Sequence, residues 1–114
     1  MIPFINRFHG HSSLNYVYKN GQAVRSRLIT FKYITNKHRK NSRIAVVISK
    51  KVLKSAVKRN YIRRRVYEYM RQQMPEFNNV YDIVVIVSSG EMLTIDYDDM
   101  KQTFDQIVCQ ANII

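Results

Sequence analysis

The sequence predicts an α/β fold, a small α+β two-layer sandwich in which helices pack on one central sheet in the order α-β-β-α-β-α. Three observations predict it. Segments 43–49 and 80–87 are rich in β-branched residues and apolar on both faces, as in buried strands. Segment 55–73 between them has the apolar spacing of an amphipathic helix. A strand, a helix and a second apolar strand in this order indicate a βαβ unit with parallel strands.

The first third of the chain predicts a helix followed by a strand. Ser12 and Ser13 are suited to capping a short helix that extends to about Asn20. Gly21 then stands where a glycine commonly ends a helix. Segment 28–34 is predicted to be the first strand, because its residues alternate in part between apolar and polar.

The later elements are predicted from their apolar faces and from residues that begin or end helices. Segment 43–49 is expected to be a central strand, because both of its faces are apolar. The helix over 55–73 is expected to stop before Pro75, and Asp96 with Asp99 is suited to start a last helix. The residues that these helices are expected to bury are Ile62, Val66, Tyr69 and Met70 in the first, and Met100, Phe104, Ile107, Val108 and Ala111 in the second.

The length of the chain predicts a single domain over residues 1–114. The apolar fraction of 46% allows a folded core and argues against a disordered basic tail. No apolar run approaches the length of a membrane span, and the N-terminal residues lack the apolar stretch of a secretory signal. The one cysteine, Cys109, excludes an internal disulfide and a cysteine-based zinc site. A cytoplasmic protein is therefore expected.

Positive charge is concentrated in the first two thirds of the chain, within a net charge of +11. Residues 1–75 contain 18 Lys and Arg and one acid, Glu68, whereas residues 76–114 contain one base and seven acids. The densest part is the basic run, residues 49–65, which carries eight cations and no acid. Cations this close repel one another unless an anion is near, and the phosphate backbone of a nucleic acid is the commonest polyanion. We therefore expect residues 1–75 to form a nucleic-acid-binding face.

Motifs in two parts of the chain together resemble a known family. The pair Lys50-Lys51 follows a predicted strand, and Ala-Val-Lys-Arg-Asn-Tyr-Ile-Arg-Arg at 56–64 opens the long helix. Leu-Asn-Tyr-Val-Tyr-Lys-Asn-Gly at 14–21 ends the first helix, and Arg7-Phe8 precedes it. In this element order, the motifs resemble the protein subunit of bacterial ribonuclease P over residues 6–111. The resemblance implies a left-handed crossover between the parallel strands, where the general rule favours a right-handed one.

Two positions depart from the pattern of this family. Tyr61 stands where the family usually has Arg, and Leu14 stands where it usually has an aromatic residue. Tyr61 points away from the apolar stripe of its helix, so it can stack on RNA or pack on a neighbouring loop, and the sequence leaves both roles open. Leu14 can contact a nucleotide but lacks a stacking face.

The resemblance implies that the RNA performs catalysis and the protein performs binding. The RNA subunit would carry the catalytic centre, which hydrolyses one phosphodiester bond to remove the 5′ leader of precursor tRNA, with Mg²⁺ bound mainly by the RNA. The chain would bind ribonuclease P RNA and precursor tRNA with no catalytic residue, organic cofactor or protein oligomer required. The residues expected to bind the ribonuclease P RNA, mainly its phosphates, are Lys50, Lys51, Lys54, Lys58, Arg59, Asn60, Tyr61, Arg63, Arg64 and Arg65.

The resemblance also implies a second RNA surface, a cleft between the first helix and the open face of the sheet that receives the single-stranded leader. By position, this leader cleft would include Leu14, Tyr18, Thr30, Lys32 and Val47. An aromatic ring for stacking and a lysine for phosphate are ordinary chemistry for binding single-stranded RNA. Core packing is the simpler alternative for Tyr18 and Val47.

The histidines and the acidic residues do not predict a catalytic or metal site. His9, His11 and His38 lie in polar segments without metal-site spacing, and the acids at 96–99 are explained by the start of a helix. The first alternative function is a ribosomal or assembly-type protein that binds structured RNA without a processing role. The second is a membrane-surface module, which would need the apolar stripe of the long helix to be available for insertion.

Overall fold

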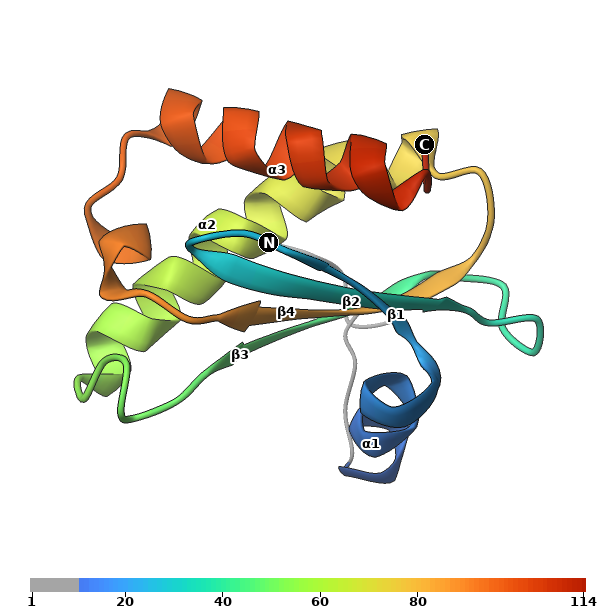
Figure 1. The fold of residues 1–114 in the computed structure, drawn as a ribbon, viewed down its shortest axis with the longest axis horizontal. Coiled ribbons are helices and arrows are strands. Elements are labelled where there is room, and N and C mark those ends of the chain that lie inside the picture. The colour runs from blue at the N-terminus through green and yellow to red at the C-terminus, as the bar shows by residue number, and fades with distance from the viewer. Residues whose placement is uncertain (1–10) are drawn as a thin grey trace.

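The computed structural model describes residues 11–114, and the elements in this range follow the predicted order with one strand added (Figure 1). The helices are α1 (His11–Asn20), α2 (Ala56–Gln73) and α3 (Tyr97–Ala111). The strands are β1 (Gln22–Arg25), β2 (Ile29–Thr35), β3 (Arg43–Ile48) and β4 (Tyr81–Val87). Two short 3₁₀ helices, η2 (Met74–Glu76) and η3 (Gly90–Leu93), follow α2 and β4. The motif at Arg7-Phe8 and the histidine His9 lie outside the described residues.

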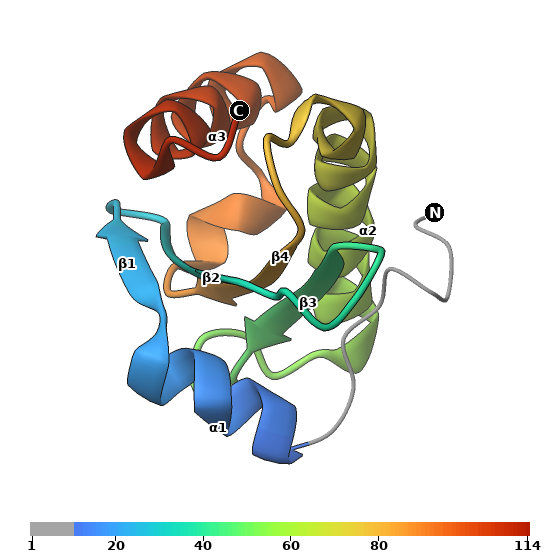
Figure 2. The ribbon, with the colours of Figure 1, turned by 90° about the vertical axis from the view of Figure 1, so that its right-hand side faces the viewer.

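The four strands form one mixed sheet in the order β1-β2-β4-β3. β2 pairs antiparallel with β1 and with β4, whereas β3 and β4 are parallel and joined through α2, so the predicted βαβ unit is confirmed. The crossover is left-handed. Both strands point to the left in Figure 1 and so run away from the viewer in Figure 2, where the chain turns anticlockwise from β3 through α2 to β4.

The prediction that segment 43–49 forms a central strand is wrong, because β3 lies at an edge of the sheet. Both of its faces are nevertheless buried. Ile44 and Val46 belong to the core cluster that includes the buried residues of α2, whereas Ala45 packs with Val17 of α1 on the other face. Helices therefore cover β3 on both sides, and its apolar pattern reflects burial rather than a central position in the sheet.

Helices cover the two faces of the sheet unequally (Figures 1 and 2). α2 and α3 lie together on one face, and all of the residues predicted to form their apolar faces are buried there. Among residues 11–114, α1 is the one helix that crosses the opposite face, where it buries Val17 against Ala45 and Val84. The larger core thus fixes α2 against the sheet, and the smaller cluster fixes α1 on the face that the resemblance assigns to the leader cleft.

Local sequence explains how α2 and α3 begin. Ser55 is the N-cap of α2, and its side chain accepts a hydrogen bond from the backbone N–H of Lys58 at 3.3 Å. Asp96 is the N-cap of α3 as expected, but its side chain makes no capping hydrogen bond. Asp98 and Asp99 lie in the first turn of α3, where the helix dipole favours negative charge.

The junction between α1 and β1 differs from the prediction. α1 includes Ser12 and Ser13, so the expectation that these serines cap it is wrong. Gly21 follows the helix as expected, but its backbone is not left-handed. A Cβ atom at Gly21 would lie 2.6 Å from the carbonyl oxygen of Val17 and 3.0 Å from that of Tyr33, so close approach of α1 to β2 requires the glycine.

Candidate nucleic-acid interface

The face of the sheet beneath α1 is organised in three rows of side chains that cross the strands. Pairing register determines these rows, because residues that are partners in neighbouring strands point to the same face. The rows are Arg25, Thr30, Ile86 and Val47 at one end, Ala23, Lys32, Val84 and Ala45 in the middle, and Ile34, Asp82 and Arg43 at the other end. α1 covers part of the middle row, so the two end rows flank the helix.

The five residues predicted for the leader cleft lie together on this face. Leu14, Tyr18 and Val47 are partly buried around the small cluster beneath α1, so none of them is a fully buried core residue. Lys32 extends its ammonium group to 5.2 Å from the ring centroid of Tyr18 and 3.4 Å from the carbonyl oxygen of Tyr18. Thr30 lies in the end row. The structure thus places an aromatic ring and a cation side by side on this face.

Residues that the sequence analysis missed also line this face. Ile86 lies between Thr30 and Val47 in the end row, and it is partly buried. Ile34 and Tyr16 border a hollow on the other flank of α1. Alternation along 81–87 marks Ile86 and Val84 as sharing a face, but only the register with the neighbouring strands shows that this face is the one beneath α1.

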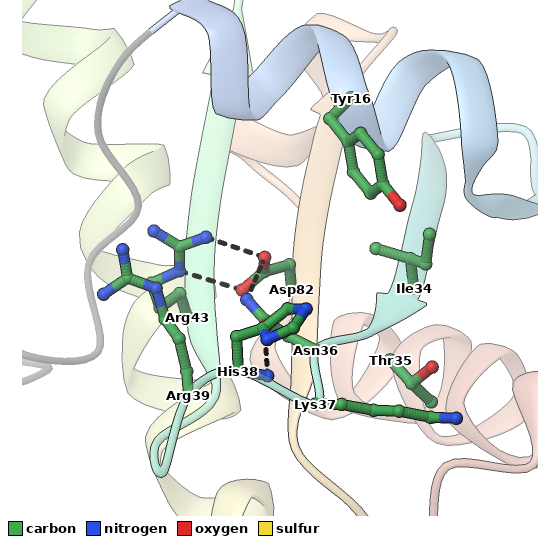
Figure 3. A pocket seen from close by; sticks show the side chains of 9 residues that line it. All are labelled: Tyr16, Ile34, Thr35, Asn36, Lys37, His38, Arg39, Arg43 and Asp82. Atoms are coloured by element: carbon green, nitrogen blue, oxygen red, sulfur yellow. Dashed lines mark hydrogen bonds and ion pairs between the residues drawn. The ribbon is translucent and has the colours of Figure 1, made fainter.

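A hollow of about 590 Å³ lies at the far end of this face, beside the loop that joins β2 to β3 (Figure 3). Its floor is a buried ion pair in which Arg43 donates to Asp82 through Nε at 2.9 Å and Nη2 at 2.7 Å. Asn36 Nδ2 donates to the same carboxylate at 2.8 Å, and its Oδ1 accepts from the backbone N–H of His38 at 3.1 Å. This network holds the loop with its exposed Lys37 in place.

The lysines of the basic run lie on the loop between β3 and α2 and on the first turn of α2. Lys50, Lys51, Lys54 and Lys58 are all exposed. Arg59, from the first turns of α2, folds back under this loop and donates Nη1 to the carbonyl oxygens of Leu53 at 2.9 Å and Lys54 at 2.8 Å. Arg59 therefore fastens the lysine loop to α2.

The next turn of α2 presents polar side chains to solvent. Arg63 Nη1 donates to Oδ1 of Asn60 at 3.0 Å, which orients the amide of Asn60. Both residues border a shallow hollow on the surface of α2 that Arg64 also lines. Asn60 and Arg64 are exposed, and Arg63 is partly buried. The structure thus brings these three predicted RNA-binding residues together.

Arg65 and Tyr61 lie on another side of α2, next to η3. Arg65 donates Nη1 to the carbonyl oxygen of Met92 at 2.9 Å and Nη2 to that of Ile95 at 2.6 Å. The ring of Tyr61 lies against this guanidinium, with 5.8 Å from its centroid to Cζ, and the side chain is 45% exposed. Tyr61 therefore contacts a neighbouring side chain and still presents its ring to solvent. Arg65 links α2 to the segment before α3.

The cations of the basic run have no carboxylate partner among residues 11–114. The ion pairs of the described chain are Arg27 with Glu91, Arg43 with Asp82, Arg71 with Glu68, and Lys101 with Asp105. A hydrogen bond from Arg71 lowers the pKa of the Glu68 carboxyl, so this acid is charged and paired beside the basic surface. The eight cations of the run can therefore pair with phosphates without first breaking an ion pair within the protein.

The described residues form neither a metal-binding cluster nor a membrane-spanning helix. In the part of the chain that the structure describes, no group of three or more His, Cys, Asp or Glu side chains is placed to hold a metal ion. The described helices include none that combines the length and hydropathy needed to span a bilayer. The apolar stripe of α2, which a membrane-surface module would need, is buried against the sheet.

Comparison with known proteins agrees with this geometry. Residues 3–112 match the family model described as Ribonuclease P. The ribonuclease P protein component of Prochlorococcus marinus (strain AS9601) is 31% identical, with 99% of this chain and 98% of that protein covered. The corresponding protein of Caldanaerobacter subterraneus subsp. tengcongensis is 33% identical, with 81% of this chain and 77% of that protein covered.

Solved structures show the same fold. The RNase P protein of Staphylococcus aureus superposes with a TM-score of 0.84 at 22% identity, covering 95% of this chain and 96% of that one. The RNase P protein of Thermotoga maritima superposes with a TM-score of 0.76 at 21% identity, covering 89% of this chain and 94% of that one. At 22% and 21% identity, the structural comparison supports the fold. Membership of the family rests on the family model and the sequence relatives.

Proposed function

The chain belongs to the ribonuclease P protein family, and we propose that it binds the catalytic RNA and the 5′ leader of precursor tRNA, promoting endonucleolytic removal of the leader. As a protein component of this ribonucleoprotein, it takes part in the processing of tRNA 5′ ends together with ribonuclease P RNA. The observation that carries the proposal is the family match over residues 3–112, nearly the whole chain.

The exposed part of the basic run supports a role in anchoring the RNA subunit. The exposed lysines would act as point charges, namely Lys50, Lys51, Lys54 and Lys58. Arg64 would bind one phosphate through two N–H groups. Asn60, oriented by Arg63, offers a neutral donor and acceptor beside them. Arg59 and Arg65 already use N–H groups on backbone carbonyls, so we assign them first to holding this surface in shape and second to contacting RNA.

The leader cleft supports a role in binding single-stranded RNA. The ring of Tyr18 would stack on a base, and Lys32 beside it would neutralise a leader phosphate. Leu14, Thr30 and Val47, with the newly found Ile86, would form the walls and floor. This cleft lies beneath α1, on the face of the sheet opposite α2, so one protein would hold two RNA segments on two faces (Figure 2).

Catalysis is assigned to the RNA subunit, because the proposed role of the chain is binding and orientation. Mg²⁺, held mainly by the RNA, would supply the activated water for phosphodiester hydrolysis. We therefore assign the ion to the RNA and no residue of the described chain to it. The protein would act in the cytoplasm, as a single copy that needs no protein oligomer.

A ribosomal or assembly-type RNA-binding protein was the main alternative, and the family match favours the ribonuclease P role over it. Filter binding at a series of salt concentrations tests the proposal. We expect the protein to bind ribonuclease P RNA about tenfold or more tightly than a structured control RNA of equal length at the same salt, because non-specific phosphate contacts are equal in the two. Equal affinity for both RNAs would favour the alternative.

A further inference from the structure

Two exposed tyrosines border one hollow between α2 and the start of α3. The side chains of Tyr61 and Tyr97 are 45% and 40% exposed. With Arg64, Arg65 and Glu68, they line a hollow of about 390 Å³. Neither ring belongs to the described cores. Two rings that are left in contact with water at the same hollow offer flat apolar surface to a ligand.

Arg65 lines this hollow and is anchored to the backbone beside it. Its guanidinium is fixed by hydrogen bonds to the carbonyl oxygens of Met92 and Ile95, at 2.9 and 2.6 Å, and so it cannot easily swing away. The ring of Tyr61 lies over that fixed group, with 5.8 Å between the ring centroid and Cζ. These bonds hold the segment from Met92 to Ile95, just before α3, against α2. The ring is thus held in place before any ligand arrives, which lowers the entropy cost of binding.

The charges around the hollow differ from one side to the other. On the α2 side, Arg64 is exposed and has no ion-pair partner among the described residues. The acid on that side, Glu68, is neutralised by Arg71 through bonds of 2.5 and 3.2 Å. On the α3 side, Tyr97 is flanked by Asp96, Asp98 and Asp99. The hollow therefore fits a ligand with a flat, uncharged body and an anionic group at one end only.

We propose that this hollow binds one unstacked nucleobase of the ribonuclease P RNA, with the base against the rings of Tyr61 and Tyr97 and its phosphate beside Arg64. A nucleotide has the required shape and charge, since its base is flat and uncharged and its phosphate is anionic. The inference rests on the proposed function. Through Tyr97, α3 would also belong to the RNA interface. The bound RNA would be the RNA subunit, because the hollow lies on the α2 side of the sheet, away from the residues predicted for the leader cleft.

The test compares tyrosine variants of the full chain in binding to ribonuclease P RNA. Tyr61→Ala and Tyr97→Ala should each weaken binding about tenfold, or about 1.4 kcal/mol, as expected for the loss of base stacking on an aromatic ring. Tyr61→Phe and Tyr97→Phe keep the rings and should bind within about twofold of the wild type. The salt dependence of binding should be unchanged in all four, because no phosphate contact is removed. Equal melting temperatures establish that the variants are folded.

Three results would overturn the inference: wild-type affinity in both alanine variants, equal losses in the phenylalanine and alanine variants, or a loss seen only with precursor tRNA. The matched variant Arg64→Ala separates this inference from the proposed function. If Arg64→Ala weakens binding and lowers the salt dependence while the tyrosine variants do not differ from the wild type, the stacking site is wrong and the proposed function stands. If the wild-type protein shows no preference for ribonuclease P RNA, the proposed function itself fails.

Discussion

Arg59 and Arg64 lie on the same helix, but of these two only Arg59 uses its guanidinium to bind backbone carbonyl oxygens. Nη1 of Arg59 bridges the carbonyl oxygens of Leu53 and Lys54, whereas the guanidinium of Arg64 is exposed and has no hydrogen-bond partner among residues 11–114. A guanidinium that satisfies two carbonyls stabilises the fold, and an unpaired one at the surface is available to phosphate. The two arginines should therefore separate structural from RNA-binding effects.

We predict that Arg59→Ala lowers the free energy of unfolding by about 1–2 kcal/mol, because two hydrogen bonds from a charged donor are lost. Arg64→Ala should leave stability unchanged within about 0.5 kcal/mol. It should weaken RNA binding and reduce the slope of log affinity against log salt by about one. Urea denaturation and salt-dependent binding measure the two effects. A large stability loss in Arg64→Ala, or none in Arg59→Ala, would contradict this division of roles.

Tyr69 is a buried residue that makes stability depend on pH. Its hydroxyl donates to Asp105 at 2.5 Å, and burial, followed by this hydrogen bond, raises its pKa far above the ordinary value for tyrosine. Because the pKa of the folded state exceeds that of the unfolded state, the unfolded chain loses its proton first as the pH rises. The contribution of Tyr69 is therefore complete below about pH 10 and is lost progressively above it.

We predict that Tyr69→Phe costs about 1 kcal/mol of unfolding free energy at pH 7, because the hydrogen bond to Asp105 is lost. The difference from the wild type should shrink at pH 11, where ionisation of Tyr69 in the unfolded state already penalises the wild type. Chemical denaturation of both proteins at the two pH values checks this. The same difference at pH 7 and pH 11 would show that Tyr69 does not contribute to the pH dependence.

At the scale of elements, periodicity predicts the long helices and fully buried strands well. The buried residues of α2 and α3 match the predicted stripes, because the 3.6-residue period is clear over 18 and 15 residues. β1 was missed because its four residues, Gln22–Arg25, are mostly exposed and are defined as a strand only by pairing with β2. The edge position of β3 was also missed, because burial by α1 and α2 gives an edge strand the same pattern as a central one.

The candidate site was predictable only in part. Exposed lysines and arginines follow from the density of charge in the basic run, and the leader-cleft residues follow from the resemblance. The bonds of Arg59 and Arg65 end on backbone carbonyls, which carry no sequence signal. Tyr97 is far from Tyr61 in the sequence and reaches the same hollow only through the packing of α3 beside α2.

The junction between α1 and the sheet positions α1 over the residues predicted for the leader cleft. A Cβ atom at Gly21 would lie 2.6 Å from the Val17 carbonyl oxygen, so we predict that Gly21→Ala shifts α1 and lowers the free energy of unfolding by more than about 1 kcal/mol. Gly90→Ala is the matched control, because the nearest atom to its added Cβ, the Val52 carbonyl oxygen, would be 3.7 Å away. Thermal melts of the two variants should differ. If they melt alike, the close approach is not what requires the glycine.

The leader cleft makes a distinct prediction through Lys32. The ammonium group beside the ring of Tyr18 would neutralise a leader phosphate that mature tRNA lacks. Lys32→Ala in the complex with ribonuclease P RNA should therefore weaken binding of precursor tRNA several-fold and leave mature tRNA binding nearly unchanged. Competition binding with the two tRNAs measures the difference. Equal losses for both would remove Lys32 from the leader cleft.

At the scale of the whole molecule, the two proposed RNA surfaces lie on opposite faces of one sheet. The larger core fixes α2 and the lysine loop on one side, and the smaller cluster fixes α1 on the other. Seven of the eight acids of the chain lie in residues 76–114. Every acid that forms an ion pair in the described residues lies outside the basic run. A rigid body of this kind can hold the RNA subunit and the leader in a defined relation, which is the contribution we assign to the protein.

Reconstituted cleavage tests whether this chain promotes removal of the 5′ leader. Ribonuclease P RNA and precursor tRNA are mixed at low Mg²⁺, with and without the protein, and release of the 5′ leader is followed over time. Because the protein would supply cationic contacts to both RNAs, it should raise the cleavage rate well above that of the RNA alone. An unchanged rate, at protein concentrations that saturate binding to the RNA, would show that this chain does not promote leader removal.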